Sequence, residues 1–183
     1  MEQPGSGRRV AFIALGLAVA LALGAGAVWT WQRSAANAAA AQAATWLYDV
    51  KLPDADGVEH PLQAWRGTLL VVNFWATWCT PCIEEMPELQ RFADEFANHN
   101  VAVIGIGVDD ADRIRDFRRE HALRLPLLAA GFDGMDLARR LGNPDPVLPY
   151  TALISPDGRI LEQHSGRIQP PELRRWVGDH GAR

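Results

Sequence analysis

Two cysteines, Cys79 and Cys82, are the only ones in the 183-residue chain, and two residues separate them. A stabilising disulfide framework would need several cysteines at scattered positions. A zinc site would need three or four protein ligands, but there is no second cysteine pair, and the five histidines show no paired ligand spacing: His60, His99, His121, His164 and His180. The spacing therefore favours a redox couple, and we expect no bound metal and no separate cofactor.

The place of this pair in the predicted structure supports the redox interpretation. The apolar run 69–75 predicts a buried strand, and the amphipathic stretch 81–98 predicts a helix, so Cys79 lies near a helix N-terminus. Exposed amides and the positive end of the helix dipole stabilise a thiolate there, which lowers the pKa of the first cysteine below the ~8.5 of a free thiol. We expect Cys79 to be the attacking nucleophile and Cys82 to resolve the mixed disulfide.

The cysteines belong to a longer segment, residues 74–89, with the sequence FWATWCTPCIEEMPEL. A second segment, residues 148–160, reads LPYTALISPDGRI. Together they resemble the active-site segment and the cis-proline loop of TlpA/ResA-type thioredoxin-like proteins, and the resemblance extends over roughly 46–177. It implies a membrane-anchored thiol:disulfide oxidoreductase of the thioredoxin fold, tethered in the bacterial periplasm.

The resemblance also implies which residues contact the substrate. It implies a cis peptide bond between Leu148 and Pro149, opposite the cysteines, with the adjoining backbone pairing with an extended substrate segment. Since only ~5–6% of X-Pro bonds in folded proteins are cis, this expectation depends on the family. The expected substrate-binding residues are Trp78, Thr80, Pro81, Leu148 and Tyr150.

Glu85 matches a family position whose carboxylate tunes cysteine ionisation. It lies three residues after Cys82, on the same helix face, where a proton-relay role is physically possible. The alternative is a carboxylate that only complements the helix dipole, which suits Glu84 and Glu88 better. Asn73 occupies the position of the buried acid of ordinary thioredoxins, which strengthens the hypothesis for Glu85.

The remaining patterns predict an α/β domain in which strands and helices alternate. They indicate a mixed sheet, parallel in the middle, with an antiparallel edge hairpin and helices on both faces. The expected strands are 46–52 and 58–61 as an N-terminal hairpin, then 69–75, 101–108, 125–130, 150–155 and 159–164. The expected helices are a turn at 62–66, 81–98 with a kink at Pro87, a helix capped by Asp109 or Asp110 and ending at His121, 135–141 and 170–179.

The N-terminal part reads as a membrane anchor and a tether. Residues 10–31 form an uncharged run of about the ~20 residues that a helix needs to cross a bilayer. Two arginines precede it and one follows closely, which favours residues 1–9 in the cytoplasm, a linker at 32–44 and an exported domain at 45–183. A cleaved signal peptide is the alternative, while Arg8 and Arg9 match a twin-arginine signal poorly.

The net charge of -4 and the pI near 5.7 do not indicate the basic surface that nucleic-acid binding requires, so we expect no nucleic-acid partner. We expect a reductase that is recharged by a membrane electron donor of the thiol type. Its clients would be proteins with oxidised cysteine pairs, such as apocytochrome c or copper-site proteins. A disulfide-forming oxidase remains the main alternative.

Two other classes of protein fit the sequence less well. A peroxiredoxin, with its antioxidant activity, needs Thr or Ser three residues before its cysteine, where this chain has Ala76. A copper chaperone of the Sco type favours three residues between its cysteines and a well-placed histidine. The two-residue spacing here argues against that reading.

Overall fold

The computed structural model describes residues 44–181, together with Gly24 and Val28. The chain divides into two units, Met1–Ala39 and Ala40–Arg183, and the second contains the whole fold described below. The predicted anchor at 10–31 and linker at 32–44 lie almost entirely outside the described residues and stay predictions. Within the described residues, no helix combines the length and the apolar character that a membrane span requires.

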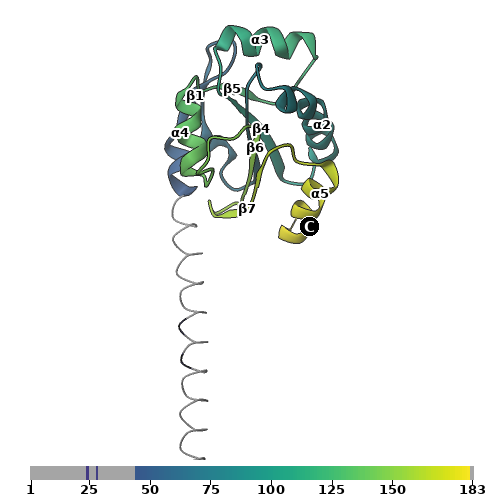
Figure 1. Cartoon of the computed structure of the whole chain (residues 1–183). Helices are drawn as coiled ribbons and strands as arrows, with labels where there is room; N and C mark the ends of the chain where they lie inside the picture. The colour runs from purple at the N-terminus through teal and green to yellow at the C-terminus, as the bar shows by residue number, and fades with distance from the viewer. Residues whose placement is uncertain (1–23, 25–27, 29–43, 182–183) are drawn as a thin grey trace, which may run out of the picture. The chain divides into compact units, whose positions relative to one another are not determined.

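A five-stranded mixed sheet forms the centre of the domain. Its strands are β3 (Leu69–Trp75), β4 (Val101–Gly107), β5 (Leu127–Ala129), β6 (Tyr150–Ile154) and β7 (Ile160–Ser165). They lie in the order β5-β4-β3-β6-β7 (Figure 1). β3, β4 and β5 are parallel, β6 is antiparallel to β3, and β7 is antiparallel to β6. The predicted mixed sheet with an antiparallel edge hairpin is confirmed.

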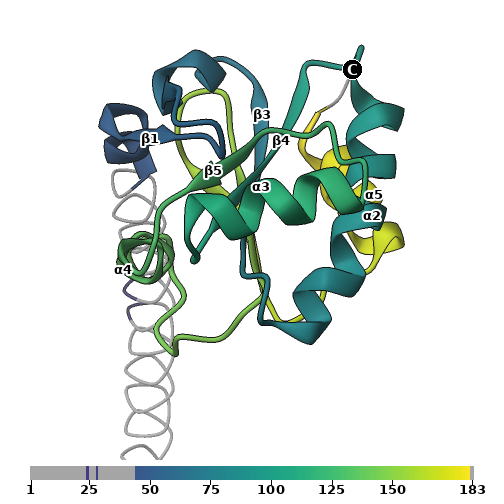
Figure 2. The same ribbon diagram turned by 90° about the horizontal axis from the view of Figure 1, so that it is seen from above.

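Helices cover both faces of this sheet, as predicted. They are α2 (Thr80–Phe96), α3 (Ala111–Glu120), α4 (Asp133–Arg140) and α5 (Pro170–His180). Side chains of α2, α3 and α5 share one buried cluster with β3, whereas α4 contributes to the cluster on the other face. Figure 2 shows α2 and α5 on one side of the sheet and α4 on the other.

The two buried clusters follow from the alternation of side chains along the strands. In β3, Val71 and Trp75 face the cluster that contains both cysteines, while Val72 and Phe74 face the opposite cluster. Successive residues of a strand point to opposite faces, so a strand covered on both sides must be apolar throughout. This is why the run 69–75 is continuous in apolar character apart from Asn73.

The N-terminal hairpin is shorter than predicted. A 3-10 helix, η1 (Trp46–Asp49), replaces most of the expected first strand, and β1 (Lys51–Pro53) pairs with β2 (Glu59–Pro61). A second 3-10 helix, η2 (Leu62–Trp65), confirms the predicted helical turn. The apolar residues Leu47 and Tyr48, which suggested a strand, are buried in this 3-10 helix instead.

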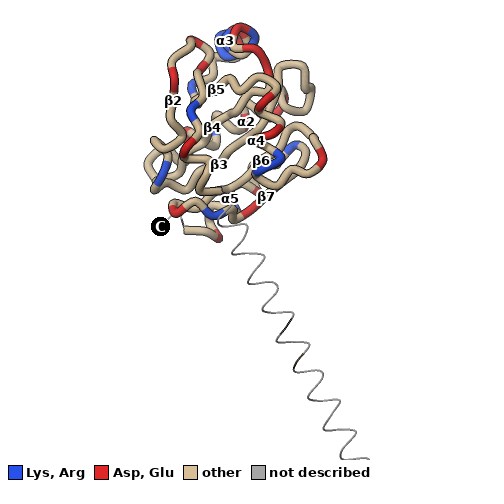
Figure 3. Tube along the Cα trace, turned by 90° about the vertical axis from the view of Figure 1, so that its left-hand side faces the viewer, with Lys and Arg blue, Asp and Glu red and all other residues tan. Residues whose placement is uncertain are grey.

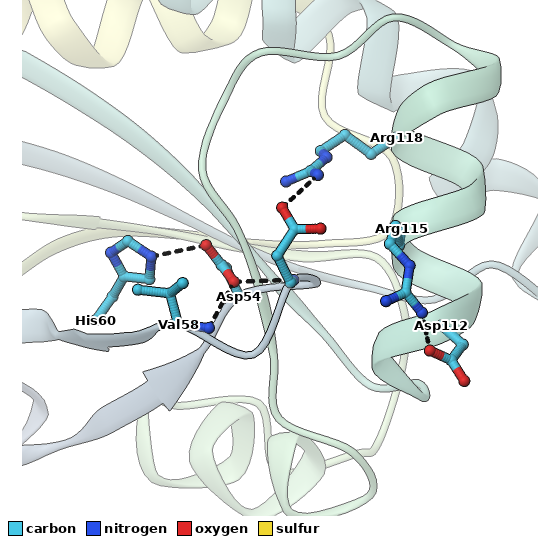
Figure 4. Close-up of polar contacts among 7 residues, drawn as sticks. Asp54, Val58, His60, Asp112, Arg115 and Arg118 are labelled. Carbon is cyan, nitrogen blue, oxygen red and sulfur yellow. Dashed lines mark hydrogen bonds and ion pairs between the residues drawn. The ribbon is translucent and has the colours of Figure 1, made fainter.

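Polar contacts hold the turn of the hairpin and connect it to α3 (Figure 4). The carboxylate of Asp54 accepts the backbone amides of Asp56 and Val58, each at 2.9 Å, and lies 2.9 Å from Nε2 of His60. Arg118 of α3 donates to Asp56 at 2.7 Å. The hairpin is therefore fixed beside the last turns of α3.

One prediction about the helices needs revision. The backbone of Asp110 occupies the N-cap position of α3, but no side-chain oxygen caps this helix, and the carboxylate of Asp109 binds elsewhere. Helix α2 runs from Thr80 to Phe96 as one element that includes Pro87. The kink expected at this proline stays a prediction.

Charged residues of both signs are distributed over the described domain. Basic and acidic residues are interspersed along the chain trace (Figure 3), and many of them form ion pairs, such as Arg174 with Glu95 and Arg124 with Asp94. This surface agrees with the small net charge of the chain, -4.

Candidate active site

Cys79 and Cys82 form a disulfide at the N-terminus of α2, with their Cα atoms 5.2 Å apart. Cys79 is the N-cap residue of this helix, and its carbonyl accepts the amide of Ile83 at 3.1 Å. The side chain of Cys82 is completely buried, whereas Cys79 retains 7% of its surface. An external thiol or disulfide can therefore reach the pair only through Cys79.

The local sequence determines why the helix begins here. Pro81 lies in the first turn, where its missing amide hydrogen costs no helical hydrogen bond. Both residues between the cysteines, Thr80 and Pro81, are exposed. Because the first amides of α2 point toward Cys79, a thiolate formed on this residue is stabilised electrostatically.

The loop before β6 confirms the expected cis peptide bond between Leu148 and Pro149. Leu148 packs against the cluster that contains both cysteines. The loop is held by two hydrogen bonds: the amide of Gly166 donates to the carbonyl of Pro149 at 2.8 Å, and the side chain of Asn143 donates to the carbonyl of Val147 at 2.9 Å. The fold thus brings the second motif of the sequence to the cysteine pair.

Tyr150 does not present its side chain to a substrate. Its ring is 1% exposed and packs 6.2 Å from Phe74, and its hydroxyl donates to the carbonyl of Leu141 at 2.8 Å. Burial raises the pKa of this phenol well above its ordinary value. Any substrate contact made by Tyr150 is confined to its backbone.

Two tryptophans near the cysteines differ in their surroundings. Trp78, which immediately precedes Cys79, is 58% exposed. Trp75 is completely buried and packs 5.0 Å from the ring of Phe117. Trp78 is therefore available to an incoming polypeptide, and Trp75 belongs to the core.

Glu85 is a buried carboxylate on the same helix as the disulfide, with 1% of its surface exposed. Asn73 donates to one carboxylate oxygen at 2.9 Å, and the amide of Ile168 donates to the other at 3.3 Å. Burial raises the pKa of Glu85 to about 8, although the Ile168 amide, the charge of Arg167 and the Asn73 amide each favour the ionised form. The group therefore exchanges a proton near neutral pH.

Arg167 supplies the positive charge nearest to this carboxylate. It donates to Glu84 at 2.7 Å and to Glu88 at 3.2 Å, so it bridges two carboxylates of α2. The neighbouring charge of Glu88 raises the pKa of Glu85, while that of Arg167 lowers it. In this arrangement Glu85 is buried, Glu84 is exposed and Glu88 is half-buried, and the proton-relay role of Glu85 stays a prediction.

The sequence did not reveal how the turn before Cys79 is supported. The carboxylate of Asp109, at the end of β4, accepts both the amide of Thr77, at 3.1 Å, and its hydroxyl. Asp109 is 8% exposed. In the sequence, an aspartate just before a helix indicates a helix cap. Only the parallel pairing of β3 with β4 places Asp109 beside Thr77.

A cavity of about 460 Å³ lies away from the disulfide. It is formed by the hairpin, α3 and the segment that leads into β5, and its lining is Asp54, His60, Arg118, Leu123, Arg124, Leu125, Pro126, Leu127 and Leu128. Figure 4 shows three of these residues, Asp54, His60 and Arg118. In the part of the chain that the structure describes, no three His, Cys, Asp or Glu side chains are grouped to hold a metal ion.

A disulfide at a helix N-terminus, a cis-proline loop beside it and a mixed sheet covered on both faces define a thioredoxin-like dithiol–disulfide protein. A sequence model of the AhpC/TSA family matches residues 43–163, and the chain belongs to this family. The match includes both cysteines, Glu85 and Pro149.

Individual relatives narrow the class. The thiol-disulfide oxidoreductase ResA of Geobacillus kaustophilus (strain HTA426) is 29% identical over 130 residues, which cover 70% of this chain and 72% of the relative. The thioredoxin-like protein YneN of Bacillus subtilis (strain 168) is 27% identical over 135 residues, 68% of this chain and 72% of the relative.

Solved structures agree with these relatives. A thiol-disulfide oxidoreductase from Bacteroides fragilis NCTC 9343 is 29% identical with a TM-score of 0.60, covering 71% of this chain and 95% of that one. A secreted thiol-disulfide isomerase from Corynebacterium glutamicum shares the fold, with 24% identity, a TM-score of 0.63 and coverage of 70% and 81%. The chain is a thiol–disulfide oxidoreductase, and it therefore acts on partners that contain cysteines.

Proposed function

We propose that the protein is an extracytoplasmic protein-disulfide reductase whose reduced Cys79–Cys82 pair opens oxidised cysteine pairs in client proteins. The observation that carries the mechanism is the arrangement of α2. An accessible cysteine lies at the helix N-terminus, a buried cysteine lies one turn further, and a buried carboxyl follows after another turn.

Each residue has one role in the exchange. The thiolate of Cys79 attacks one client sulfur, the client disulfide breaks, and a mixed disulfide forms while the other client sulfur leaves as a thiolate. Cys82 then loses its proton and attacks Cys79, which restores the enzyme disulfide and releases the second client thiolate. Two electrons pass to the client, and the two client thiolates take up two protons.

Glu85 supplies the base for the second step. Cys82 is completely buried, so water cannot easily remove its proton. A carboxyl with a pKa of about 8 is close in basicity to a thiol, which suits it to take this proton and to return it to a leaving thiolate. Three residues of helix place the two groups about 4.5 Å apart along the axis, on the same face.

The location and the partners belong to the same proposal. The apolar run at 10–31 would anchor the chain in the inner membrane, with the catalytic domain facing the periplasm or an equivalent extracytoplasmic space. A membrane electron donor of the thiol type would reduce the disulfide again after each turnover. Apocytochrome c and copper-site proteins are the proposed clients, because both need reduced cysteines to accept their metal centre.

The reduction potential of the Cys79–Cys82 couple tests the direction of the reaction. The full-length chain would be equilibrated with dithiothreitol and glutathione buffers, and its thiols would be counted by alkylation. A value near the thioredoxin end of the range, about -270 mV, supports a reductase. A value near the oxidising end, about -120 mV, would make the protein a disulfide donor.

Location is tested independently of the chemistry. Alkaline phosphatase and a fluorescent protein that folds only in the cytoplasm would each be fused after residue 44. Activity of the phosphatase fusion supports export of the domain, and fluorescence of the other fusion contradicts it. Resistance to extraction by alkaline carbonate separates an anchor from a cleaved signal.

A further inference from the structure

Large apolar side chains are exposed at only a few positions of the described domain. They are Val58, Trp78, Phe132 and Val147. Phe132 is the most exposed of them, at 83%, and it lies in the turn between β5 and α4. A phenylalanine ring exposed to water does not stabilise the isolated fold, so it is a candidate for binding another molecule. The residues around it indicate what that molecule is.

The sheet topology brings three of these residues to one end of the domain. The parallel register places Trp75, Gly107 and Ala129 in one row at the carboxyl ends of β3, β4 and β5. The antiparallel strand β6 begins one residue away from this row, because Tyr150 pairs with Phe74. Trp78 and Phe132 each come three residues after the row, and Val147 comes three residues before Tyr150.

The disulfide lies within this apolar group. Trp78 immediately precedes Cys79 and continues from β3, whereas Phe132 continues from β5 and Val147 leads into β6. In the strand order β5-β4-β3-β6, Phe132 follows a strand on one side of β3 and Val147 precedes a strand on the other side, while the disulfide lies on the helix that follows β3 itself. We call Trp78, Phe132 and Val147 the apolar rim.

Hydrogen bonds restrain two loops of the apolar rim. The amide of Ala130, two residues before Phe132, donates to the carbonyl of Gly107 in β4 at 2.9 Å. The side chain of Asn143 donates to the carbonyl of Val147, within the same loop, at 2.9 Å. The backbone near Phe132 is therefore tied to the sheet, and that of Val147 is tied within its own loop.

We propose that Phe132 is a specificity-determining residue that binds an apolar side chain of the client, in an extended segment whose cysteine is attacked by Cys79. The proposal rests on the disulfide exchange proposed above and adds the sequence preference of the client. An unfolded or partly folded polypeptide is the occupant, because a folded protein buries the apolar side chains that this rim would bind.

Strand spacing fixes where that side chain lies in the client. Neighbouring strands are about 4.8 Å apart, so β5 lies about 10 Å from β3, and an extended chain spans this distance in about three residues. The preferred client therefore carries an aromatic or large aliphatic residue about three positions from its reactive cysteine.

Synthetic cystine peptides test the proposal with the full-length protein. One peptide carries phenylalanine three residues before the first cysteine, a second carries it three residues after the last, and a third has serine at both places. We expect at least one phenylalanine peptide to be reduced with about tenfold higher kcat/KM than the serine peptide, the change expected for burying part of an aromatic ring. The difference should lie in KM, because Phe132 does not touch the reacting sulfurs.

Phe132→Ser should abolish this preference, and Phe132→Leu should restore most of it. Val58→Ser is the matched control: it removes an exposed valine of the hairpin turn, next to Asp54 (Figure 4), and should keep the parent preference. Equal reduction of all peptides by the parent, or a preference that survives Phe132→Ser, would overturn the role of Phe132 and leave the exchange reaction standing. A parent protein that reduces no cystine, glutathione disulfide included, would overturn the proposed function itself.

Discussion

At the scale of single residues, the hydrogen bond between Asn73 and Glu85 can be kept in both the ionised and the protonated state of Glu85. The Asn73 amide nitrogen donates both to the Glu85 carboxylate and to the hydroxyl of Thr151, at 3.0 Å, while the amide oxygen has no hydrogen-bond partner among the described residues. Rotating this amide by half a turn would present the oxygen to a protonated carboxyl as an acceptor. Asn73 can therefore follow a proton on Glu85, which a buried aspartate at this position could not do without adding a charge.

Glu85→Gln should change how stability depends on pH. Because burial raises the pKa of Glu85 from its ordinary 4.5 to about 8, the folded protein holds a proton that the unfolded chain releases between these values. The stabilisation is complete below about pH 4.5 and is lost as the pH rises to 8, by up to about 1.4 kcal/mol per pH unit. Urea unfolding of the oxidised protein at pH 5, 7 and 9 would show this slope in the parent and a flatter profile in the variant.

The matched control is Glu84→Gln, which removes an exposed carboxylate from the same helix turn and from the same arginine, Arg167. It should retain the slope of the parent. Equal slopes in the parent and in Glu85→Gln would show that the Glu85 carboxyl is ionised in the folded protein throughout this range.

The residues of the candidate site could be predicted unequally well. Cys79, Cys82, Glu85 and Pro149 follow from motif resemblance, because short segments specify them and the cis bond is present in the structure. Tyr150 was expected at the substrate but is buried, because β6 lies between β3 and β7 and is covered on both faces, which only the folded sheet shows. Of the apolar rim, only Trp78 was predicted, since Phe132 and Val147 come to the same end of the domain only through the strand order of the folded sheet.

At the scale of elements, the loop between β4 and α3 supports the turn that carries the disulfide. Asp109 connects them through two hydrogen bonds to Thr77, and its other carboxylate oxygen accepts the amide of Asp110. Since this carboxylate is nearly buried, its loss would leave the Thr77 amide without an acceptor. The contact therefore sets the position of the residues that precede Cys79.

Asp109→Ala should destabilise the oxidised protein by about 1–3 kcal/mol, the cost of leaving a buried donor unpaired. Guanidinium unfolding followed by tryptophan fluorescence measures this. Asp110→Ala is the control, because its side chain is exposed and makes no capping hydrogen bond, and it should unfold close to the parent midpoint. A loss in Asp109→Ala no larger than that in Asp110→Ala would argue that the contact does not hold the turn.

The elements show why hydrophobic pattern predicts some segments and misreads others. β3 and α2 were predicted correctly because β3 is a continuous apolar run and α2 is a long stretch with one helical period. The segment 46–49 was misread as a strand, because two adjacent apolar residues occur in both conformations. Its 3-10 form is decided by contacts with the rest of the domain, including the Tyr48 hydroxyl that donates to the Ser155 carbonyl at 3.4 Å.

At the scale of the whole molecule, the folded domain includes residues that come before its first strand. Ala44, Leu47 and Tyr48 are all buried in the cluster on the α4 side of the sheet or beside it. Gly158, in the turn between β6 and β7, has a φ of 90° and lies so close to Tyr48 that an added Cβ would be 3.0 Å from its ring. The segment that precedes β1 is therefore part of the core and fixes where a soluble fragment can begin.

A fragment that starts at residue 40 should fold with the stability of the full-length chain, whereas one that starts at residue 51 should be strongly destabilised. The second fragment lacks Leu47, and replacing one such buried leucine by alanine typically costs about 2–5 kcal/mol. Leu47→Ala in the longer fragment isolates this contribution, and Asp49→Ala, at an exposed position of the same 3-10 helix, is its control. Thermal unfolding measures the midpoints of the four proteins. We expect Asp49→Ala to unfold with the parent fragment from residue 40, Leu47→Ala well below it and the fragment from residue 51 lowest. Similar midpoints for all four would place the boundary of the domain after η1, because the core would then be complete without this helix.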